Sequence, residues 1–346
     1  MDSRTRLLTV AIALCVCTTL TSVPSSGATG SVEGVPHFSK VFVIAGENTT
    51  YFHVKPTNMP YLLGTLRPGS AWFTNFYAAT HWSQANYIAL TSGQFNRCQQ
   101  QDYGALCHQN VPNLYHQIDQ AGRTWKTWLE GGIGRCDFGG SVCEPEGPCP
   151  LTGFYTTGNP PINYDDIEGK YGVFSYTDKS DECLANDIYA GGTTGNPMKV
   201  FDKMLATGTD VPDFNLVLPN GCEDGIGNCQ PINNRYTQFD EFLRREIPKI
   251  EASPAWDDES VIIVWFDEDQ RTSGMSLTCK TCPPDGLGQG GHTILDIISP
   301  LIEPGDYDAR VYTYSVLRTL QDGLGLSGYG YLGRANEVGP IDEIWQ

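Results

Sequence analysis

The chain has 346 residues, of which 40 are Asp or Glu and 22 are Lys or Arg, so its formal net charge at pH 7 is −18. This surplus of negative charge repels nucleic acids and anionic membrane surfaces at long range, and we expect neither as a partner. A phosphate-bearing ligand therefore needs local help, from a metal ion or from a helix N-terminus.

The N-terminal residues have the pattern of a secretory signal peptide. Two arginines precede an apolar run over 7–20, and a patch of small residues ends at Ala28. The apolar run is shorter than the roughly 18 residues that a membrane-spanning helix needs, and no later segment reaches that length. We therefore expect a signal peptide over 1–28, no stable membrane insertion, and a secreted, extracellular protein with one α/β domain over 29–346.

The cysteines indicate disulfides rather than a metal site. Two of the 12 cysteines lie in the signal peptide, so the mature chain keeps 10, an even number in an oxidising compartment. Two pairs are close enough in sequence to close short loops: Cys98 with Cys107, and Cys222 with Cys229. The others cannot be paired from the sequence. Residues 131–185, which begin with a stretch rich in Gly, Pro and Cys, are expected to form a disulfide-tied surface insertion.

The predicted elements alternate between strands and helices. Short apolar runs bounded by Gly or polar residues predict strands, and longer segments rich in Ala, Leu and charged residues predict helices. In chain order we expect a strand at 40–46, a short helix at 59–66, a strand at 71–78, helices at 83–92 and 111–120, strands at 124–129 and 213–218, a helix at 238–251, strands at 261–266 and 293–299, and a helix at 313–324. This alternation predicts an α/β fold, with a mostly parallel central sheet and helices on both faces.

Polar side chains follow three of the predicted strands. Glu47 and Asn48 follow the first strand, the segment 80–83 follows the second, and the acidic run 267–269 follows the strand at 261–266. Ligands gather at the carboxyl ends of strands in such sheets. Adjacent acids repel one another unless water or a cation compensates their charge. We therefore expect a divalent metal ion here, with the first pair supplying further oxygen ligands.

Ser83 and Asn48 each have two interpretations. Ser83 opens the predicted helix at 83–92, where a serine is commonly an ordinary N-cap. The same position surrounds a phosphate with free backbone N–H groups, and a bound metal lowers the pKa of a hydroxyl enough to make it a nucleophile. Asn48 begins an N-glycosylation sequon, yet it also follows a buried strand, and we favour a role in the site over a glycan.

Eight motifs, in order from Val41 to Leu326, resemble the phosphoesterase family of secreted acid phosphatases and phospholipase-C-type enzymes, within the alkaline-phosphatase-like superfamily. They are "VFVIAGEN", "MPYL", "ATHWSQANYIALTSG", "AGRTWKTWLEG", "LPNGCEDG", "IPKIEASPAW", "VIIVWFDED" and "YSVLRTLQDGLGL". The resemblance implies a phosphoric ester hydrolase with a divalent metal ion of open identity. The substrate it implies is a small-molecule or lipid phosphate ester, and monoester and phospholipid diester stay open.

The resemblance also implies roles for single residues. It places Ser83 at the family's nucleophile, Asn86 at an asparagine that holds a phosphoryl oxygen, and Asn48 at a residue that assists the phosphate. His81 precedes the nucleophile and is a candidate for part of the proton transfer. The metal ligands that the resemblance implies are Glu47, Asp267, Glu268, Asp224 and His292.

Three histidines of the family pattern are absent. The family's "KHNP" appears as 170–173, its "DMH" as 224–226 and its late "THYS" as 312–315, none of which holds a histidine. Imidazoles at such positions ligate metal or protonate a leaving oxygen. The alternative hypothesis is therefore a catalytically impaired protein that binds phosphate ligands on the same fold. The two hypotheses differ in whether a Ser83→Ala substitution abolishes a measurable turnover.

Overall fold

The computed structural model describes residues 30–96, 98, 104–130, 136, 158–170, 179–191, 195–270 and 282–346. The predicted signal peptide over 1–28 lies outside the described residues, and so does much of the predicted insertion over 131–185.

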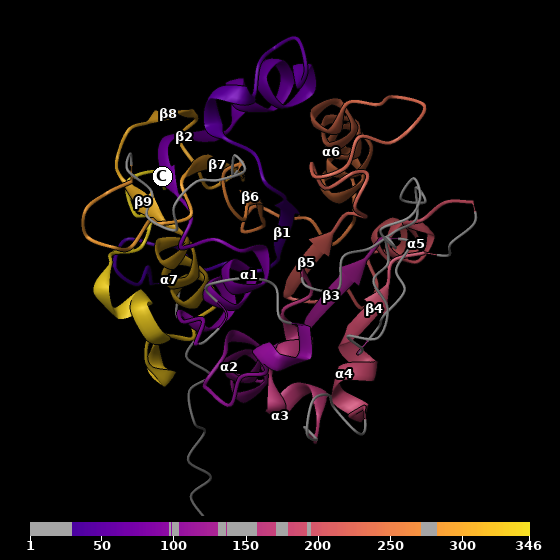
Figure 1. Ribbon diagram of the computed structural model, residues 1–346. Coiled ribbons are helices and arrows are strands. Elements are labelled where there is room, and N and C mark those ends of the chain that lie inside the picture. Colours follow the sequence, from indigo (N-terminus) through magenta and orange to yellow (C-terminus); the bar gives the residue numbers. More distant parts are fainter. Residues whose placement is uncertain are drawn as a thin grey trace, which may run out of the picture.

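The described residues form a nine-stranded sheet that runs through the molecule (Figure 1). Its order is β4 (Asp187–Tyr189), β3 (Trp125–Leu129), β5 (Phe214–Leu218), β1 (Val41–Gly46), β6 (Val261–Phe266), β7 (His292–Ile298), β2 (Ala71–Tyr77) and β8 (Gly305–Tyr307), with β9 (Val311–Tyr312) also beside β2. Only β7 runs antiparallel to its neighbours, β6 and β2; the other pairs are parallel. The other strands therefore all end at one edge of the sheet.

The central strands are buried on both faces. All six residues of β1 and all six of β6 are buried, which explains why their sequences are unbroken apolar runs. In β1, Val41 and Val43 point into one core cluster, whereas Phe42 and Ile44 point into another on the opposite face. The predicted fold class, a mostly parallel sheet covered on both sides, is confirmed.

Helices cover the two faces. One core cluster joins the sheet to α1 (Ser83–Ser92), α2 (Leu114–Gln120), α3 (Asp165–Glu168), α4 (Asp181–Asn186) and α7 (Thr313–Gly323). The other joins it to α5 (Lys199–Thr207) and α6 (Arg235–Glu251), which lie across the sheet from α1 and α7 in Figure 1. Short 3-10 or π turns occupy Tyr51–His53, Leu62–Leu66, Arg67–Gly69, Gly104–Cys107, Pro161–Asn163, Ser327–Tyr329 and Gly333–Glu337.

Disulfides fix three loops among the described residues. Cys98 bonds Cys107 and Cys222 bonds Cys229, so both short-loop pairs that the spacing predicted are confirmed. A third bond, from Cys136 to Cys183, joins the beginning of the predicted insertion over 131–185 to its end, in α4. Within the part of the chain that the structure describes, we find no helix with the length and apolar character needed to span a bilayer.

Candidate active site

The carboxyl edge of the sheet brings together a serine and several acids. β1 and β6 pair in register up to Gly46 and Phe266, so Glu47 and Asp267 leave the sheet side by side. The chain after β2 reaches the same place, and Ser83 Oγ donates a hydrogen bond to Glu47 Oε2 at 2.8 Å and lies 3.4 Å from Glu268 Oε1. These residues are almost fully buried.

Ser83 is the first residue of α1 and not its cap. The N-cap position is Trp82, which makes no side-chain hydrogen bond to the helix, and the Ser83 hydroxyl instead faces Glu47. The hydroxyl therefore lies at the positive end of a ten-residue helix without being used to close it. Of the two interpretations of this serine, the N-cap is wrong.

The Glu47 carboxylate is held by three donors. Its Oε2 accepts from Ser83 and from Asn48 Nδ2 at 2.8 Å, and its Oε1 accepts from the Tyr87 hydroxyl at 2.9 Å. Burial, followed by the charges of Glu47 and Asp267, raises the pKa of Tyr87 well above its usual value, so this phenol stays a donor. Asn48 donates its side-chain amide to Glu47 and is half-buried, and its role in the site stays a prediction.

Asp267 carries an acceptor that has no partner. Its Oδ1 accepts the backbone N–H groups of Asn48 at 3.0 Å and Glu268 at 2.7 Å. Its Oδ2 is fully buried and has no hydrogen-bond partner among the described residues. Burial, then the charges of Glu47 and Glu268, raise the pKa of Asp267 well above its usual range. Such an orphaned buried oxygen is costly unless a cation compensates it.

Asp224 lies beside this group. Its carbonyl oxygen accepts the Glu47 N–H at 2.7 Å, and its Oδ1 accepts the Ile226 N–H at 2.8 Å. Burial, then the charge of Glu47, raise the pKa of Asp224 well above its usual value, while Arg235 acts in the opposite direction. We call Glu47, Asp224, Asp267 and Glu268 the strand-end carboxylates.

His81 is held between two acids. Its Nδ1 lies 2.5 Å from Glu268 Oε2, and its Nε2 lies 3.4 Å from Asp269 Oδ1. The ring is buried, two residues before Ser83. A side chain at Gly290 would collide with the carbonyl of Thr80, so this glycine allows the loop that carries His81 to approach the chain before β7.

Asn86 binds the main chain of the same loop. Its Oδ1 accepts the Thr80 N–H at 2.9 Å, and its Nδ2 donates to the carbonyls of Thr80 at 2.6 Å and Trp82 at 3.3 Å. The amide therefore fixes the turn that presents His81 and Ser83. Its contact with a phosphoryl oxygen stays a prediction.

His292 lies in an aromatic stack. Its ring is parallel to Tyr51, with centroids 4.4 Å apart, and stacks on Tyr77 at 5.1 Å, while its Nε2 lies 2.9 Å from the Thr74 carbonyl oxygen. Burial lowers the pKa of this imidazole. β7 begins at the carboxyl edge because it runs antiparallel, but these contacts do not join the ring to the strand-end carboxylates.

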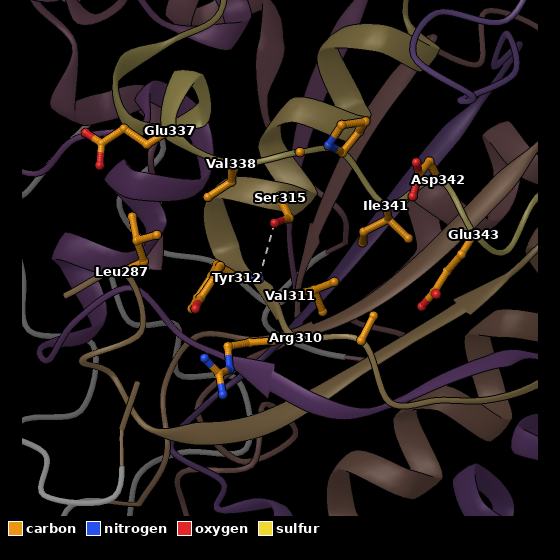
Figure 2. Close-up of a pocket in the computed structure, with 13 residues that line it drawn as sticks. Leu287, Arg310, Val311, Tyr312, Ser315, Glu337, Val338, Ile341, Asp342 and Glu343 are labelled. Atoms are coloured by element: carbon orange, nitrogen blue, oxygen red, sulfur yellow. Dashed lines mark hydrogen bonds between the residues drawn. The ribbon is translucent and has the colours of Figure 1, made fainter. Parts of the chain in front are cut away.

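The segment 312–315, which stands where the family pattern has its late histidine, lines a cavity at the start of α7. Figure 2 shows Tyr312 and Ser315 lining a cavity of about 350 Å³ with Val311 and Ile341, and the Tyr312 N–H donates to Ser315 Oγ at 3.4 Å. Thr313, which stands at the histidine position, is fully buried, and its hydroxyl has no partner among the described residues. The histidine is thus replaced by a residue of the protein interior.

The strand-end carboxylates suit a hard divalent cation by donor type, since all offer oxygen and one oxygen of Asp267 is orphaned. They are not gathered around one point: among the described residues, only Cys136, Glu168 and Cys183 have three ligand-type atoms within 4.8 Å of one another. Two of those three form a disulfide, which rules that group out as a metal site.

Tyr87 contributes to the site but was not selected from the sequence, and Asp269 was selected only as part of the acidic run 267–269. Tyr87 lies four residues after Ser83 on α1, so the helical period already placed its side chain on the same face. The contact of Asp269 with His81 depends on two loops from distant parts of the chain, and no sequence pattern indicates it.

The chain is similar to known proteins both in sequence and in fold. The model of the Phosphoesterase family matches residues 39–327. The phosphatidylinositol-3-phosphatase of Mycobacterium tuberculosis is 24% identical over 330 residues, which cover 94% of this chain and 88% of that protein. An alkaline phosphatase superfamily protein from Vibrio parahaemolyticus superposes with a TM-score of 0.47 and 16% identity over 85% of this chain and 68% of its own. Murine ectonucleotide pyrophosphatase/phosphodiesterase 5 gives 0.49 and 11% over 89% and 100%.

Proposed function

This chain belongs to the Phosphoesterase family and is a phosphoric ester hydrolase, and from that premise we propose that Ser83 is its nucleophile and a divalent metal ion its cofactor. The observation that carries this proposal is the position of one hydroxyl. Ser83 Oγ lies at the N-terminus of α1, bonded to Glu47 and 3.4 Å from Glu268, two of the strand-end carboxylates. A structural serine has no need of buried acids around it.

The chain's own residues account for the covalent steps. Ser83 Oγ forms a bond to phosphorus as the ester bond to the leaving oxygen breaks. Glu47, whose Oε2 accepts the hydrogen bond of Ser83, takes the hydroxyl proton in this proposal. Tyr87 and Asn48 hold Glu47 in position for this transfer. The N-terminus of α1 stabilises negative charge on the phosphoryl oxygens. His81, which lies between Glu268 and Asp269, donates a proton to the leaving oxygen. Water then hydrolyses the phosphoserine.

The strand-end carboxylates and Asn48 would hold the metal ion. When bound, a divalent cation polarises a phosphoryl oxygen and lowers the pKa of the serine hydroxyl. Its charge would also compensate the mutual repulsion of four buried acids, which is the physical reason to expect a cation there.

We propose a phosphate monoester as the substrate and the extracellular space as the location. The M. tuberculosis relative is named as a phosphatase of a phosphorylated inositol lipid, which favours a monoester. The N-terminal pattern and the disulfides support secretion.

A phosphoserine trap tests the proposal. Purified protein supplied with divalent metal is mixed with a chromogenic phosphate monoester, quenched in acid and digested, and the peptide that holds Ser83 is weighed. We expect the added mass of one phosphoryl group on Ser83, and none in Ser83→Ala. Ser92→Ala is the matched control, because Ser92 lies in the same helix and its hydroxyl bonds the Ile88 carbonyl at 2.9 Å.

The alternative, a binding protein without turnover, rests on the three absent histidines. It predicts that calorimetry detects phosphate-ligand binding in both wild type and Ser83→Ala, with no covalent adduct and no released product. That outcome would replace the hydrolase mechanism with binding alone.

A further inference from the structure

A polar pocket of about 290 Å³ opens at the start of α6. Its lining consists of Asn228, Asn233, Asn234, Arg235, Tyr236 and Gln270, and we call it the Arg235 pocket. None of these residues is acidic, although Asp and Glu outnumber Lys and Arg by 40 to 22 in the chain. The lining therefore combines one cation with amide and phenol groups that can donate hydrogen bonds.

Arg235 is fixed in place by its neighbours. As the first residue of α6, it donates its backbone N–H to Asn228 Oδ1 at 3.0 Å, and the side chain of Asn234 caps the helix behind it. Its Nη2 donates to the Tyr236 hydroxyl at 2.9 Å, and the guanidinium carbon lies 4.8 Å from the centre of that ring. Little conformational freedom is left to lose when the guanidinium binds a ligand.

Arg235 forms no ion pair with a carboxylate of the described residues. Among the described residues, no carboxylate lies within ion-pair distance of it, whereas Arg67, Arg245 and Arg318 each pair with one or more. Within the described part of the chain, the hydrogen bonds of its side chain come from Nη2, which leaves Nε and Nη1 to bind an anion. A guanidinium presents its donors as a planar fork that matches two oxygens of a phosphate.

The pocket adjoins the candidate active site. Arg235 Nη2 lies 3.4 Å from the carbonyl oxygen of Asn48, the residue that follows Glu47. Asp224, which bonds the Glu47 main chain, also feels the charge of Arg235. The guanidinium thus lies on the side of Glu47 that carries Asn48, while the phosphate to be cleaved belongs at Ser83.

We propose that the Arg235 pocket binds a second phosphate group of the substrate, one that is carried by the leaving group and is not cleaved. This inference rests on the proposed function and narrows the substrate class to small molecules with two or more phosphates. A lone surface arginine in a solvated helix turn explains neither the lack of an ion pair with any described carboxylate nor the amide-lined cavity beside the site. Because the chain is strongly acidic, this local cation also makes the approach of a second anion possible.

A pair of sugar phosphates tests the proposal. The values of kcat/KM are measured for fructose 1,6-bisphosphate and for fructose 1-phosphate, with the metal-supplied full chain. We expect wild type to prefer the bisphosphate, and Arg235→Met to lower the ratio of the two values roughly 10- to 100-fold, the effect of losing a charged hydrogen bond. Arg235→Lys should keep part of the preference. Arg244→Met, on the exposed surface of the same helix, is the control and should leave the ratio unchanged.

The outcomes separate this inference from the proposed function. Wild type without preference, or an unchanged ratio in Arg235→Met with wild-type melting behaviour, overturns the Arg235 pocket as a phosphate subsite but leaves the hydrolase intact. Should neither sugar phosphate be turned over, calorimetry measures the binding affinities of the two compounds, and their ratio takes the place of the kinetic ratio. Tighter binding of the bisphosphate that depends on Arg235 then supports the subsite alone, and equal or absent binding contradicts it.

Discussion

An Asp267→Asn substitution should raise the stability of the metal-free protein and weaken its metal binding. The asparagine keeps Oδ1 as acceptor for the two backbone N–H groups and places an NH₂ group where the orphaned Oδ2 lies, beside the acids Glu47 and Glu268. The substitution removes one negative charge that is buried beside two other acids, and relief of such an uncompensated buried group is worth about 1–3 kcal/mol. In chelator, we therefore expect the variant to unfold at a higher urea concentration than wild type.

The metal response of the same variant should be lost. At a metal concentration of 100 times Kd, a bound ion stabilises the folded state by about 2.7 kcal/mol. We expect wild type to gain roughly that free energy of unfolding when Mg²⁺, Mn²⁺ or Zn²⁺ is titrated in, and Asp267→Asn to gain far less. Unfolding is followed by tryptophan fluorescence.

Asp296 offers a matched control. It is fully buried on β7, its Oδ2 also has no partner among the described residues, and Ser70 bonds its Oδ1, outside the strand-end carboxylates. Asp296→Asn should gain stability in chelator yet keep the full metal response. If Asp267→Asn is less stable than wild type in chelator, or responds to metal as strongly as Asp296→Asn, the assignment of Asp267 as a metal ligand is refuted.

Burial raises the pKa of Asp296 from 3.8 to about 7. Between about pH 4 and pH 7, the folded state therefore holds a proton that the unfolded state has released. The free energy of unfolding consequently falls by about 4 kcal/mol as the pH rises over this range. Urea unfolding of Asp296→Asn at several pH values should lack that fall; parallel profiles would contradict it. Tyr87→Phe removes one donor to Glu47 and should lower kcat about tenfold with little change in melting temperature, since its ring still packs on Trp265; an unchanged kcat would show that this bond is not needed. Asn86→Ala leaves buried main-chain groups unpaired and should lower the free energy of unfolding by about 2–3 kcal/mol, and chemical denaturation that matches wild type would rule this out.

The sequence predicts best the elements whose burial pattern is simple. The strand at 261–266 and the helix at 83–92 are confirmed to the residue, because the first is a fully apolar run between polar residues and the second ends at Gly93, whose φ is 70°. The helix expected from 238 begins three residues earlier, since Asn234 accepts two backbone N–H groups as its cap.

Other elements were not predicted, or were predicted with different bounds, for identifiable reasons. α5 was missed although Phe201, Met204 and Leu205 have helical spacing and Gly208 follows them, so the signal was present. The helix expected at 111–120 begins only at Leu114, and the one expected at 59–66 is a π turn from Leu62. β4, β8 and β9 are two or three residues long, and no periodicity shows in so few. The direction of β7 depends on its neighbours in space, which the sequence does not reveal.

The residues of the candidate site likewise include some that the sequence indicates and some that it does not. Glu47, Ser83 and Asp267 were selected because each follows a strand, and the structure brings them together at one edge. Their catalytic and metal-binding roles stay predictions. Arg235 carries no signal in the sequence, because its importance depends on where the start of α6 meets the end of β1.

The most direct measurement is the hydrolysis of a chromogenic phosphate monoester by wild type and Ser83→Ala, each shown to be folded and to carry the same metal content. Wild type should turn over the ester, while the variant should lose at least about a thousandfold in kcat, the scale of removing a nucleophile. A folded, metal-loaded Ser83→Ala protein that hydrolyses the ester at the wild-type rate would contradict the assignment of this hydroxyl as the nucleophile.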